Sequence, residues 1–275
     1  MIDNKKTIKT NPKEDRLPKI SIVVPVLNMA KYIERTLDSI IKQRYPNFEV
    51  IIQDGLSTDG TVEVAQRLAR KYPQIIRFYS GRDKGQFDAL YKGFRKATGE
   101  IYTFINGDDY YEKNAFFAVG KDFLKYPHTL WMVGRGRIVD EKGREFAKWV
   151  TWYKNFLLKM NKYSFLLLVN YVMQPSVFFS KEAYKQFGPI TGDKIHIREF
   201  DFWYKLGKVE MPGVINRYLS CYSFFPGVGS ARYCDVIRKD DYYTTKKYTK
   251  NPLILLLRYL HNWARVFVYK IFYSK

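Results

Sequence analysis

Between residues 20 and 105 the chain alternates short β-branched runs with longer segments of helical periodicity, and this alternation constrains the fold more than any other feature. Residues 20–26 read ISIVVPV, a nearly continuous apolar run typical of a strand buried on both faces of a parallel sheet. Further strands are expected at 48–53, 75–79 and 101–105, with helices at 30–43, 61–72 and 87–97 between them. This order predicts an α/β fold with a mostly parallel, doubly wound sheet flanked by helices.

Polar loops follow the four expected strands, at Leu27-Asn28 and at residues 54–60, 81–86 and 106–109. Ligands of an open α/β sheet bind beyond the carboxyl ends of its strands, so these loops are expected to form the binding site. Asp54 ends its strand and is expected to point toward that ligand, whereas Ser57 or Asp59 is expected to cap the next helix.

The last of these loops carries two adjacent carboxylates, Asp108 and Asp109, directly after an apolar strand. Carboxylates at this position can hold a hard divalent cation, which in turn can hold a diphosphate. The alternative is purely structural, because Asp-Asp pairs also open turns and cap helices.

Composition limits the classes of partner. The 275 residues are 46% hydrophobic and 17% aromatic, which is enough for one sizeable core or for a core with a small annex. The net charge of +20 calls for an anionic partner, which is nucleic acid, anionic lipid or a phosphorylated substrate. Aromatic and basic residues are massed together in the manner of interfacial membrane proteins, which favours a lipid surface.

Residues 1–19 contain little that is apolar and are predicted to form a flexible polar tail without the hydrophobic core of a signal peptide. Cys221 and Cys234 are too few for a disulfide framework and indicate a reducing compartment, with a single bridge as the alternative. A cytoplasmic protein is therefore expected. His196 has no partner at ligand spacing and is interpreted as an ordinary surface or core histidine.

Two segments are candidates for contact with a membrane surface. Residues 149–173 are rich in Trp, Tyr, Phe and Leu, but lysines interrupt them before the ~18 uncharged residues that span a bilayer are reached. In residues 253–272 leucines and aromatic residues cover much of the expected helix, and one face collects the polar residues Arg258, His261, Asn262 and Arg265. This pattern predicts an amphipathic helix on a membrane surface; the alternative is a helix packed on its own domain or on a second subunit.

Four motifs occur in order at the expected strand ends: SIVVPVLN (21–28), QDGLSTDGT (53–61), GRDKGQFDALYKG (81–93) and ATGEIYTFINGDD (97–109). This series resembles the nucleotide-sugar domain of inverting family 2 glycosyltransferases, which have the GT-A fold. The resemblance continues more weakly to residue 232 through VGRGRIVDEKG (133–143), MQPSVFFSKEAYKQFG (173–188), REFDFWYKL (198–206) and PGVGSAR (226–232). It implies a GT-A domain at 20–235, with a nucleotide-sugar half at 20–110 and an acceptor half at 111–235. Residues 236–275 remain as a helical, basic and aromatic appendage.

The resemblance also implies roles on the donor side. Asp109, as the last residue of the family's DxD motif, is expected to bind Mg²⁺ or Mn²⁺, and Asp108 supplies further charge because Asn106 or Gly107 stands where the motif has its first carboxylate. The other donor-side residues implied are Pro25 and Asn28 beneath the nucleotide, Asp54 at the base or ribose, Asp83 at the base, Asp88 near the sugar and Arg232 at the leaving diphosphate.

On the acceptor side the family places a catalytic base just before an aromatic-rich helix, and the matching stretch contains Glu199 and Asp201. We expect Glu199 to be the base in preference to Asp201, since geometry outranks residue type for a general base. The alternative for Glu199 is a helix cap or a salt bridge. Gln174 and Trp203 match positions on the acceptor side.

The sequence thus predicts a metal-dependent, inverting glycosyltransferase that uses a nucleotide sugar, expected to be UDP-linked, in the synthesis of a surface polysaccharide or lipid-linked oligosaccharide. Its acceptor is expected to be a glycan, lipid-linked, at the inner face of the cell membrane, and the enzyme is expected to attach peripherally to that anionic surface, with a homo-oligomer possible. One alternative is sugar transfer directly to polyprenyl phosphate. A second is a basic nucleic-acid-binding protein, which the acidic strand ends argue against because they repel phosphates unless a metal intervenes.

Overall fold

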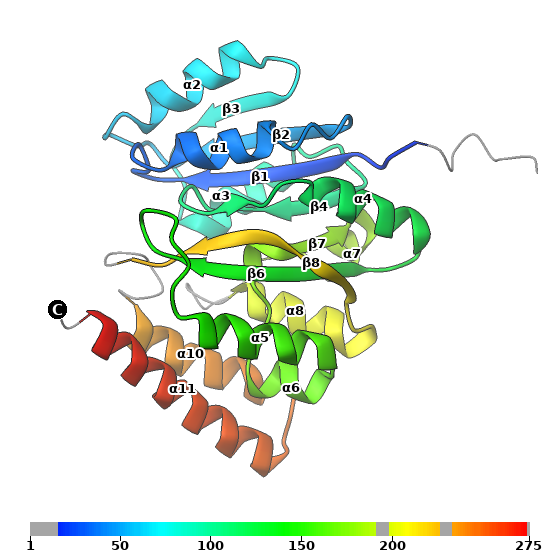
Figure 1. The fold of residues 1–275 in the computed structure, drawn as a ribbon, viewed down its shortest axis with the longest axis vertical. Coiled ribbons are helices and arrows are strands. Elements are labelled where there is room, and N and C mark those ends of the chain that lie inside the picture. Colours follow the sequence, from blue (N-terminus) through cyan, green and yellow to red (C-terminus); the bar gives the residue numbers. More distant parts are fainter. Residues whose placement is uncertain (1–15, 191–197, 226–232, 274–275) are drawn as a thin grey trace, which may run out of the picture.

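The structure is a computed structural model and describes residues 16–190, 198–225 and 233–273. An eight-stranded sheet in the order β3-β2-β1-β4-β7-β6-β8-β5 forms its centre (Figure 1). The strands are β1 (Ile20–Val26), β2 (Phe48–Asp54), β3 (Ile76–Ser80), β4 (Ile101–Phe104), β5 (Tyr110–Tyr111), β6 (Trp131–Val139), β7 (Val177–Ser180) and β8 (Gly213–Ser223).

Most strands run in one direction. β1 pairs in parallel with β2 and β4, and β2 pairs in parallel with β3. β7 is antiparallel to both β4 and β6, so that β6 and its parallel partner β8 return to the direction of β1. The ends of β1, β2, β3, β4, β6 and β8 therefore meet at one edge of the sheet, which we call the carboxyl edge.

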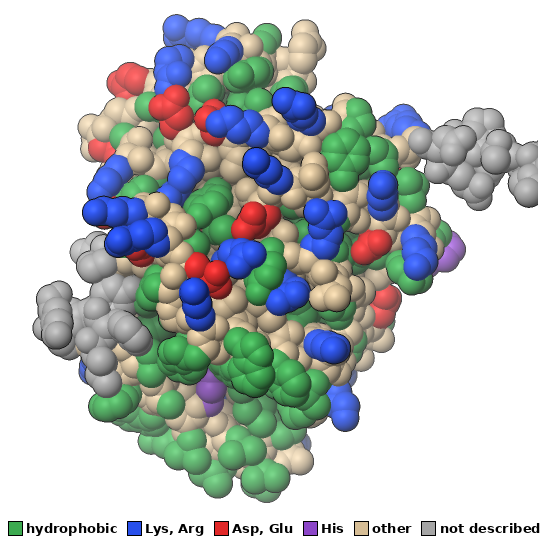
Figure 2. Space-filling view, viewed as in Figure 1, with side chains coloured by type: hydrophobic (Ala, Val, Ile, Leu, Met, Phe, Trp, Pro, Cys, Tyr) green, Lys and Arg blue, Asp and Glu red, His purple; other side chains and the backbone are tan. Residues whose placement is uncertain are grey.

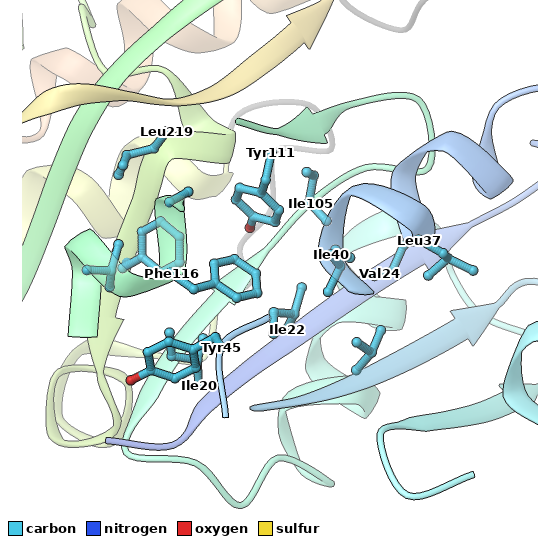
Figure 3. Close-up of a cluster of buried hydrophobic side chains, with 14 of the residues drawn as sticks. Ile20, Ile22, Val24, Leu37, Ile40, Tyr45, Ile105, Tyr111, Phe116 and Leu219 are labelled. Carbon is cyan, nitrogen blue, oxygen red and sulfur yellow. The ribbon is translucent and has the colours of Figure 1, made fainter. Parts of the chain in front are cut away.

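Helices cover both faces of the sheet. They are α1 (Ile33–Ile41), α2 (Thr61–Lys71), α3 (Gln86–Phe94), α4 (Ala115–Lys125), α5 (Lys148–Met160), α6 (Tyr163–Leu168), α7 (Lys181–Phe187), α8 (Arg198–Val209), α10 (Cys234–Lys246) and α11 (Pro252–Tyr273). Side chains of α1, α2 and α4 share one buried cluster with alternate residues of β1 such as Ile22 and Val24 (Figure 3). The opposite face packs against α3 and α5 to α8, because successive side chains of a strand point to opposite faces.

The predicted α/β class and the mostly parallel sheet are confirmed. Every strand and helix expected between residues 20 and 105 is present, with ends that differ by a few residues at most. The tail predicted at 1–19 extends too far, because Leu17 packs against the core and two hydrogen bonds hold its neighbourhood: Tyr45 donates to the carbonyl of Pro18 at 2.7 Å, and Asn47 donates to that of Leu17 at 3.0 Å. Residues 1–15 lie outside the described residues.

The C-terminal segment forms two helices, α10 and α11, that pack against each other and against the α6 and α8 side of the molecule. The polar stripe expected on α11 faces inward: Arg258 is fully buried and Asn262 nearly so. Arg258 donates from Nε to Oδ1 of Asp241 on α10 at 2.8 Å, and from Nη2 to the hydroxyl of Tyr204 on α8 at 3.0 Å. The helix therefore packs on its own domain through its polar side. Within the described residues, none of the helices combines the length and apolarity needed to cross a membrane.

Candidate active site

The four polar loops join into one rim at the carboxyl edge. The loop after β1 is tied to the loop after β2, since the amide of Asn28 donates to Ser57 Oγ and the amide of Thr58 donates to Asn28 Oδ1, both at 2.9 Å. Asp83, in the loop after β3, packs closely against Gly55 in the loop after β2. A Cβ added to Gly55 would lie 2.7 Å from Oδ2 of Asp83. Gln86 then donates to Asn106 Oδ1, which joins the loops after β3 and β4. The sequence prediction that these loops share one edge is confirmed.

Asp54 is placed differently from the prediction. Its side chain is fully buried, and its carboxylate accepts hydrogen bonds from Ser80 Oγ at 2.6 Å, from Ser57 Oγ at 2.5 Å and from the amide of Leu56 at 3.1 Å. These donors saturate the carboxylate that was expected to face the base or ribose. Asp54 holds the shape of the loop at 55–58, because an aspartate that ends a strand can satisfy the amides of the turn that follows it.

Asp108 and Asp109 lie in a turn whose backbone carbonyls are held by hydrogen bonds from α1 and β8. Arg35 on α1 donates to the carbonyl of Asp108 at 2.9 Å, and Ser223 at the end of β8 donates from Oγ to the same carbonyl at 2.6 Å. Thr36 Oγ1 lies 2.7 Å from the carbonyl of Asp109. Glycine at 107 lets the turn pack closely, since a Cβ there would meet side-chain atoms of Val26 and Met29 at 3.0 to 3.2 Å. The two carboxylates are thus held on a rigid support.

The two carboxylates differ in their availability to a ligand. Asp109 is fully buried, and its Oδ1 accepts the amide hydrogen of Ser223 at 2.7 Å. Asp108 is partly exposed, and its carboxylate accepts a hydrogen bond from its own backbone amide. Burial raises the pKa of Asp108 to about 6, and burial together with Asp108 raises the pKa of Asp109 as well. The geometry therefore makes Asp108, rather than the predicted Asp109, the carboxylate that can reach a cation.

The residues present fit a divalent cation that shares its coordination with a substrate. Asp108 and the side-chain oxygen of Asn106 offer only oxygen ligands, which suit hard cations such as Mg²⁺ and Mn²⁺. Within the described ranges no three acidic, histidine or cysteine side chains come together as a complete metal cage. Such a site matches the usual coordination of Mg²⁺, which binds one or two carboxylates and completes its coordination shell with water and substrate phosphates.

The remaining donor-side predictions are distributed along the rim. Pro25 is buried within β1, and Asn28, with a φ of 54°, is exposed at its end. Asp83 is partly exposed and accepts the amide hydrogen of Gly85 at 2.8 Å. Asp88, in the first turn of α3, accepts from the amide of Lys84 at 3.0 Å, and the ammonium of Lys92 holds the pKa of this carboxyl below its usual range. Asp88 is thus engaged by residues of its own helix and of the loop before it. Arg232 lies outside the described residues.

Glu199 and Asp201 both lie in the first turn of α8, with different surroundings. Asp201 accepts a hydrogen bond from the hydroxyl of Tyr248 at 2.7 Å and pairs with Lys205 at 3.0 Å. Oε2 of Glu199 is buried and receives no hydrogen bond from the described part of the chain. Burial is the main cause that raises the pKa of Glu199 to about 7. Glu199 is thus the carboxylate whose proton affinity suits a general base near neutral pH.

Anchors at the far end of α8 aim its first turn toward the carboxyl edge. Beyond its last turn, Glu210 accepts from Trp131 Nε1 at 2.8 Å and from Thr129 Oγ1 at 2.9 Å, at the start of β6. That start lies at the opposite edge of the sheet, and α8 runs alongside the strands (Figure 1). A helix of 12 residues covers about 18 Å, so its first turn returns toward the rim.

The two acceptor-side predictions have opposite outcomes. Gln174, in the short helical turn η1 (Gln174–Ser176), is partly exposed and donates to the carbonyl of Phe104 at 2.8 Å, directly before the turn that carries Asp108. Trp203 is 1% exposed and stacks on Trp131 with ring centroids 5.8 Å apart. The prediction that Trp203 faces the acceptor is therefore wrong, because the rest of the helix buries it in the core.

Sequence reasoning missed Arg35 and Ser223, which support the acidic turn through the contacts described above. Arg35 also lies over the ring of Tyr110, 4.7 Å from its centroid. No sequence signal marked Arg35, which lies off the buried stripe of α1 formed by Ile33, Leu37 and Ile40 and reads as an ordinary surface residue. Ser223 was equally hidden, because only the pairing of β8 with β6 brings residues so distant in sequence to the carboxyl edge.

An open sheet of this topology, with an acidic turn after β4 and linked polar loops along one edge, defines a GT-A type glycosyltransferase. Residues 21–188 match the family described as Glycosyl transferase family 2, and the chain belongs to this family. The predicted enzyme class is thereby confirmed.

Relatives and solved structures agree with this assignment. The chain is 24% identical over 254 residues to a PGL/p-HBAD biosynthesis glycosyltransferase of Mycobacterium tuberculosis, covering 90% of this chain and 92% of the relative. It is similar in fold to the mannosyltransferase PcManGT from Pyrobaculum calidifontis in complex with GDP-Man and Mn²⁺, with a TM-score of 0.65, 20% identity and coverage of 95% and 73%. It is also similar to residues 1–349 of S. aureus TarS in complex with UDP-GlcNAc, with a TM-score of 0.58, 17% identity and coverage of 93% and 73%.

Proposed function

We propose that this enzyme transfers a sugar, with inversion, from a UDP-linked donor to a hydroxyl group of a lipid-linked glycan at the cytoplasmic face of the membrane. The reaction would serve the synthesis of a surface polysaccharide or a lipid-linked oligosaccharide. The observation that carries the proposal is the continuous rim of loops at the carboxyl edge, with a partly exposed Asp108 in it and, in a helix aimed toward it, Glu199, whose Oε2 has no hydrogen-bond partner among the described residues.

On the donor side, residues 20–110 would bind the nucleotide sugar. Asn28 is exposed and Asp83 partly exposed on the rim, and they would contact the base and ribose. Asp54 would act through the loop it holds and not by direct contact. Neighbouring folds bind both a GDP-linked and a UDP-linked sugar, so the choice of UDP rests on the resemblance of the motifs.

Asp108, with the side-chain oxygen of Asn106, would hold Mn²⁺ or Mg²⁺, and Asp109 would keep the turn in place through Ser223. The bound cation would neutralise the charge that develops on the departing diphosphate. The chain's own contribution is the rigid mounting by Arg35 and Ser223, which keeps the acidic turn in one geometry.

On the acceptor side, residues 111–235 would position the attacking hydroxyl. Glu199 would accept the proton of this hydroxyl as it attacks the anomeric carbon from the face opposite the leaving group, which inverts the configuration. A carboxylate with a pKa near 7 is deprotonated in a large fraction of molecules at neutral pH and still holds a proton well once it arrives. Gln174, partly exposed beside Phe104, would line the path of the acceptor.

The decisive experiment is a panel of nucleotide sugars screened for thermal stabilisation with Mn²⁺, with Mg²⁺ and with EDTA. A ligand that binds only the folded state raises the melting temperature by mass action. We expect one UDP-sugar to stabilise the wild-type chain in a metal-dependent way, and we expect Asp108→Asn to lose the metal-dependent part. Tyr126→Ser, an exposed change far from the rim, is the matched control. Absence of any metal-dependent shift across the panel would contradict the proposal.

Product analysis separates the proposal from its alternative. Polyprenyl phosphate and a polyprenyl-diphosphate-linked glycan are offered in parallel with the donor identified by the panel. Transfer to the glycan hydroxyl supports the proposal, whereas a product on polyprenyl phosphate as the only acceptor assigns the alternative reaction.

A further inference from the structure

One side of the molecule exposes large apolar side chains that nothing in the described chain covers. Figure 2 shows hydrophobic side chains gathered over the lower end of the molecule, where Figure 1 places α5 and α11. We call this surface the apolar face and define it by six exposed apolar side chains of α5 and α11, Trp149, Trp152, Phe156, Leu256, Trp263 and Phe267, which are between 44% and 68% exposed. Contiguous exposed apolar patches of this kind mark sites of interaction with a protein or a membrane.

Buried polar contacts of α11 fix the orientation of the apolar face. Arg258 forms a buried ion pair with Asp241 and also donates to Tyr204, so α11 must turn its charged side inward. Tyr153 on α5 lies 2.8 Å from Nε2 of His261 and joins α5 to the same side of α11. Rolling α11 to hide its leucines would leave the carboxylate of Asp241 buried without Arg258, which costs several kcal/mol. The exposed apolar side is therefore a fixed property of the fold.

The charge around the apolar face is mainly positive. The sequence contains no Asp or Glu between residues 146 and 181, which include α5, and none after Asp241. Exposed lysines border the face on both segments, at Lys159, Lys162, Lys246 and Lys250. On α10, two acidic residues are exceptions: Asp235 is exposed and lies near Lys270 at 3.5 Å, and Asp240 is partly exposed. Tryptophan and phenylalanine within a rim of lysine is the composition that favours an anionic membrane interface.

A hollow of about 320 Å³ opens between α10 and α11 beside this face. It is lined by Arg238, Lys239, Tyr242, Tyr243, Tyr259 and Asn262. Asn262 is 1% exposed, and its Oδ1 has no hydrogen-bond partner within the described residues. The guanidinium of Arg238 lies 4.0 Å from the ring centroid of Trp263, which connects the hollow to the apolar face. Two cations, tyrosine hydroxyls and a buried amide are suited to a phosphate group and the polar moiety attached to it.

We infer that the apolar face docks on an anionic phospholipid bilayer and that the hollow between α10 and α11 receives a phosphate-bearing head group. The six apolar side chains would enter the interface between head groups and acyl chains, and the bordering lysines would face lipid phosphates. A second copy of this chain fits the surface less well, because a twofold contact would bring two lysine-rich borders together with few exposed carboxylates to offset them. The inference rests on the proposed function for its biological purpose, since it would place the enzyme where a lipid-linked acceptor lies.

Vesicle flotation with the full chain tests the inference without any turnover. Vesicles of phosphatidylcholine alone are compared with vesicles that contain one third phosphatidylglycerol, at low salt and at high salt. We expect the wild-type chain to float with the anionic vesicles at low salt and to be released as salt rises, since screening weakens lysine contacts with a charged surface. We expect inorganic phosphate to compete only weakly, because it cannot fill the apolar face.

Variants assign the binding to this surface. Trp152→Ser/Leu256→Ser is expected to lower the affinity for anionic vesicles at least about tenfold, whereas the matched exposed pair Tyr126→Ser/Val209→Ser leaves it unchanged. Lys239→Gln, at the hollow, is expected to lower it about fivefold. Each variant is checked for an unchanged melting temperature and an unchanged thermal shift with the nucleotide sugar.

Three results would overturn the inference: no flotation of the full chain with anionic vesicles at low salt, equal losses in the control pair, or a dimer in sedimentation that the Trp152/Leu256 variant dissociates while vesicles bind neither form. If donor binding persists in any of these cases, the proposed function stands and only the docking surface is lost. If flotation succeeds while no nucleotide sugar binds, the docking surface stands and the proposed function is lost.

Discussion

In the donor half, apolar side chains of β1 and α1 face the core and polar groups lie at the strand ends, whereas in α11 the charged Arg258 is buried and Leu256 is exposed. Helices α1 and α11 both have amphipathic patterns in sequence, although the pattern of α1 is the stronger. They differ in what lies beneath them: α1 rests on an apolar sheet, and α11 rests on Asp241 and Tyr204. An amphipathic pattern therefore predicts that a helix has two faces, but it does not predict which face a particular neighbour will accept.

The difference also separates the proposed catalytic site from the proposed docking surface. Carboxylates at the carboxyl edge are held in rigid turns where a donor can meet them, and the apolar side of the C-terminal helices is held outward by a buried ion pair. Changes in the first region should alter donor binding and turnover. Changes in the second region should alter folding stability or membrane affinity and leave the chemistry intact.

The largest expected effect belongs to Glu199→Gln. Loss of the base should lower kcat by about 10²- to 10⁴-fold without changing the donor affinity measured by thermal shift. Asp201→Asn is the matched control, because its carboxylate is already engaged by Tyr248 and Lys205 and should keep turnover within a few fold of wild type. Turnover of the Glu199 variant within a factor of ten of wild type would show that this carboxylate is only structural.

The same variant has a stability signature that a helix cap would not produce. The pKa of Glu199 is raised in the folded state, so its ionisation costs stability as pH rises from about 4.5 toward 7, and glutamine removes that cost. Glu199→Gln should thus gain melting temperature relative to wild type at pH 8, by more than at pH 5. A loss at pH 8 would indicate a capping role instead.

Arg258→Met should be the most destabilising change in the C-terminal helices. It leaves Asp241 buried with its main partner removed, and we expect a loss of about 3–5 kcal/mol in the free energy of unfolding, measured by urea denaturation. Lys42→Met, which breaks an exposed pair with Asp38, should cost less than about 1 kcal/mol. Arg258→Met/Asp241→Leu should recover much of the loss. A cost for Arg258→Met as small as that for Lys42→Met would remove the contrast between the two regions.

The pH dependence of turnover should follow Glu199. Because the base acts in its ionised form and its pKa is about 7, kcat/KM should rise about tenfold between pH 6 and pH 8 and then level off. Asp201→Asn should keep the same profile. A flat profile over this range, under conditions where the donor remains bound, would assign the proton transfer to another group.

Asp54→Asn should have the smallest of these effects and should act on the loop. The substitution weakens charge-assisted hydrogen bonds from Ser57 and Ser80, so we expect a loss of about 1–2 kcal/mol in stability with a modest rise in donor KM. Ser80→Ala, which removes one of these donors, should show the same combination at about 1 kcal/mol or less. A large rise in donor KM with unchanged stability would instead restore the predicted direct contact.

Much of the donor half could be read from the sequence, because its signals are local. Strand runs, helix periods and polar strand ends occur within a stretch of about ninety residues, and parallel order follows from their alternation. The support of the acidic turn by Ser223 could not be read in this way. It depends on β8 adding to the sheet beside β6, a pairing between segments that no local pattern specifies.

The reversed roles of Asp108 and Asp109 have the same origin. Both residues follow one strand and carry the same group, so sequence reasoning had no physical basis to rank their exposure. Ser223 engages one carboxylate and leaves the other partly exposed. The expectation that Trp203 faces the acceptor rests on the family resemblance. The stacking of Trp203 on Trp131 of β6 buries it instead.

By itself the sequence determined the α/β class, the positions of the strands, the acidic turn after the fourth of them and the two faces of the C-terminal helix, because each depends on spacing within a few turns of chain. Only the tertiary structure decided which carboxylate of the acidic turn is partly exposed, which carboxylate of α8 is held by Tyr248 and Lys205, and which side of α11 faces outward. Those outcomes depend on side chains from distant segments, whose hydrogen bonds and burial set the free energy of each polar group.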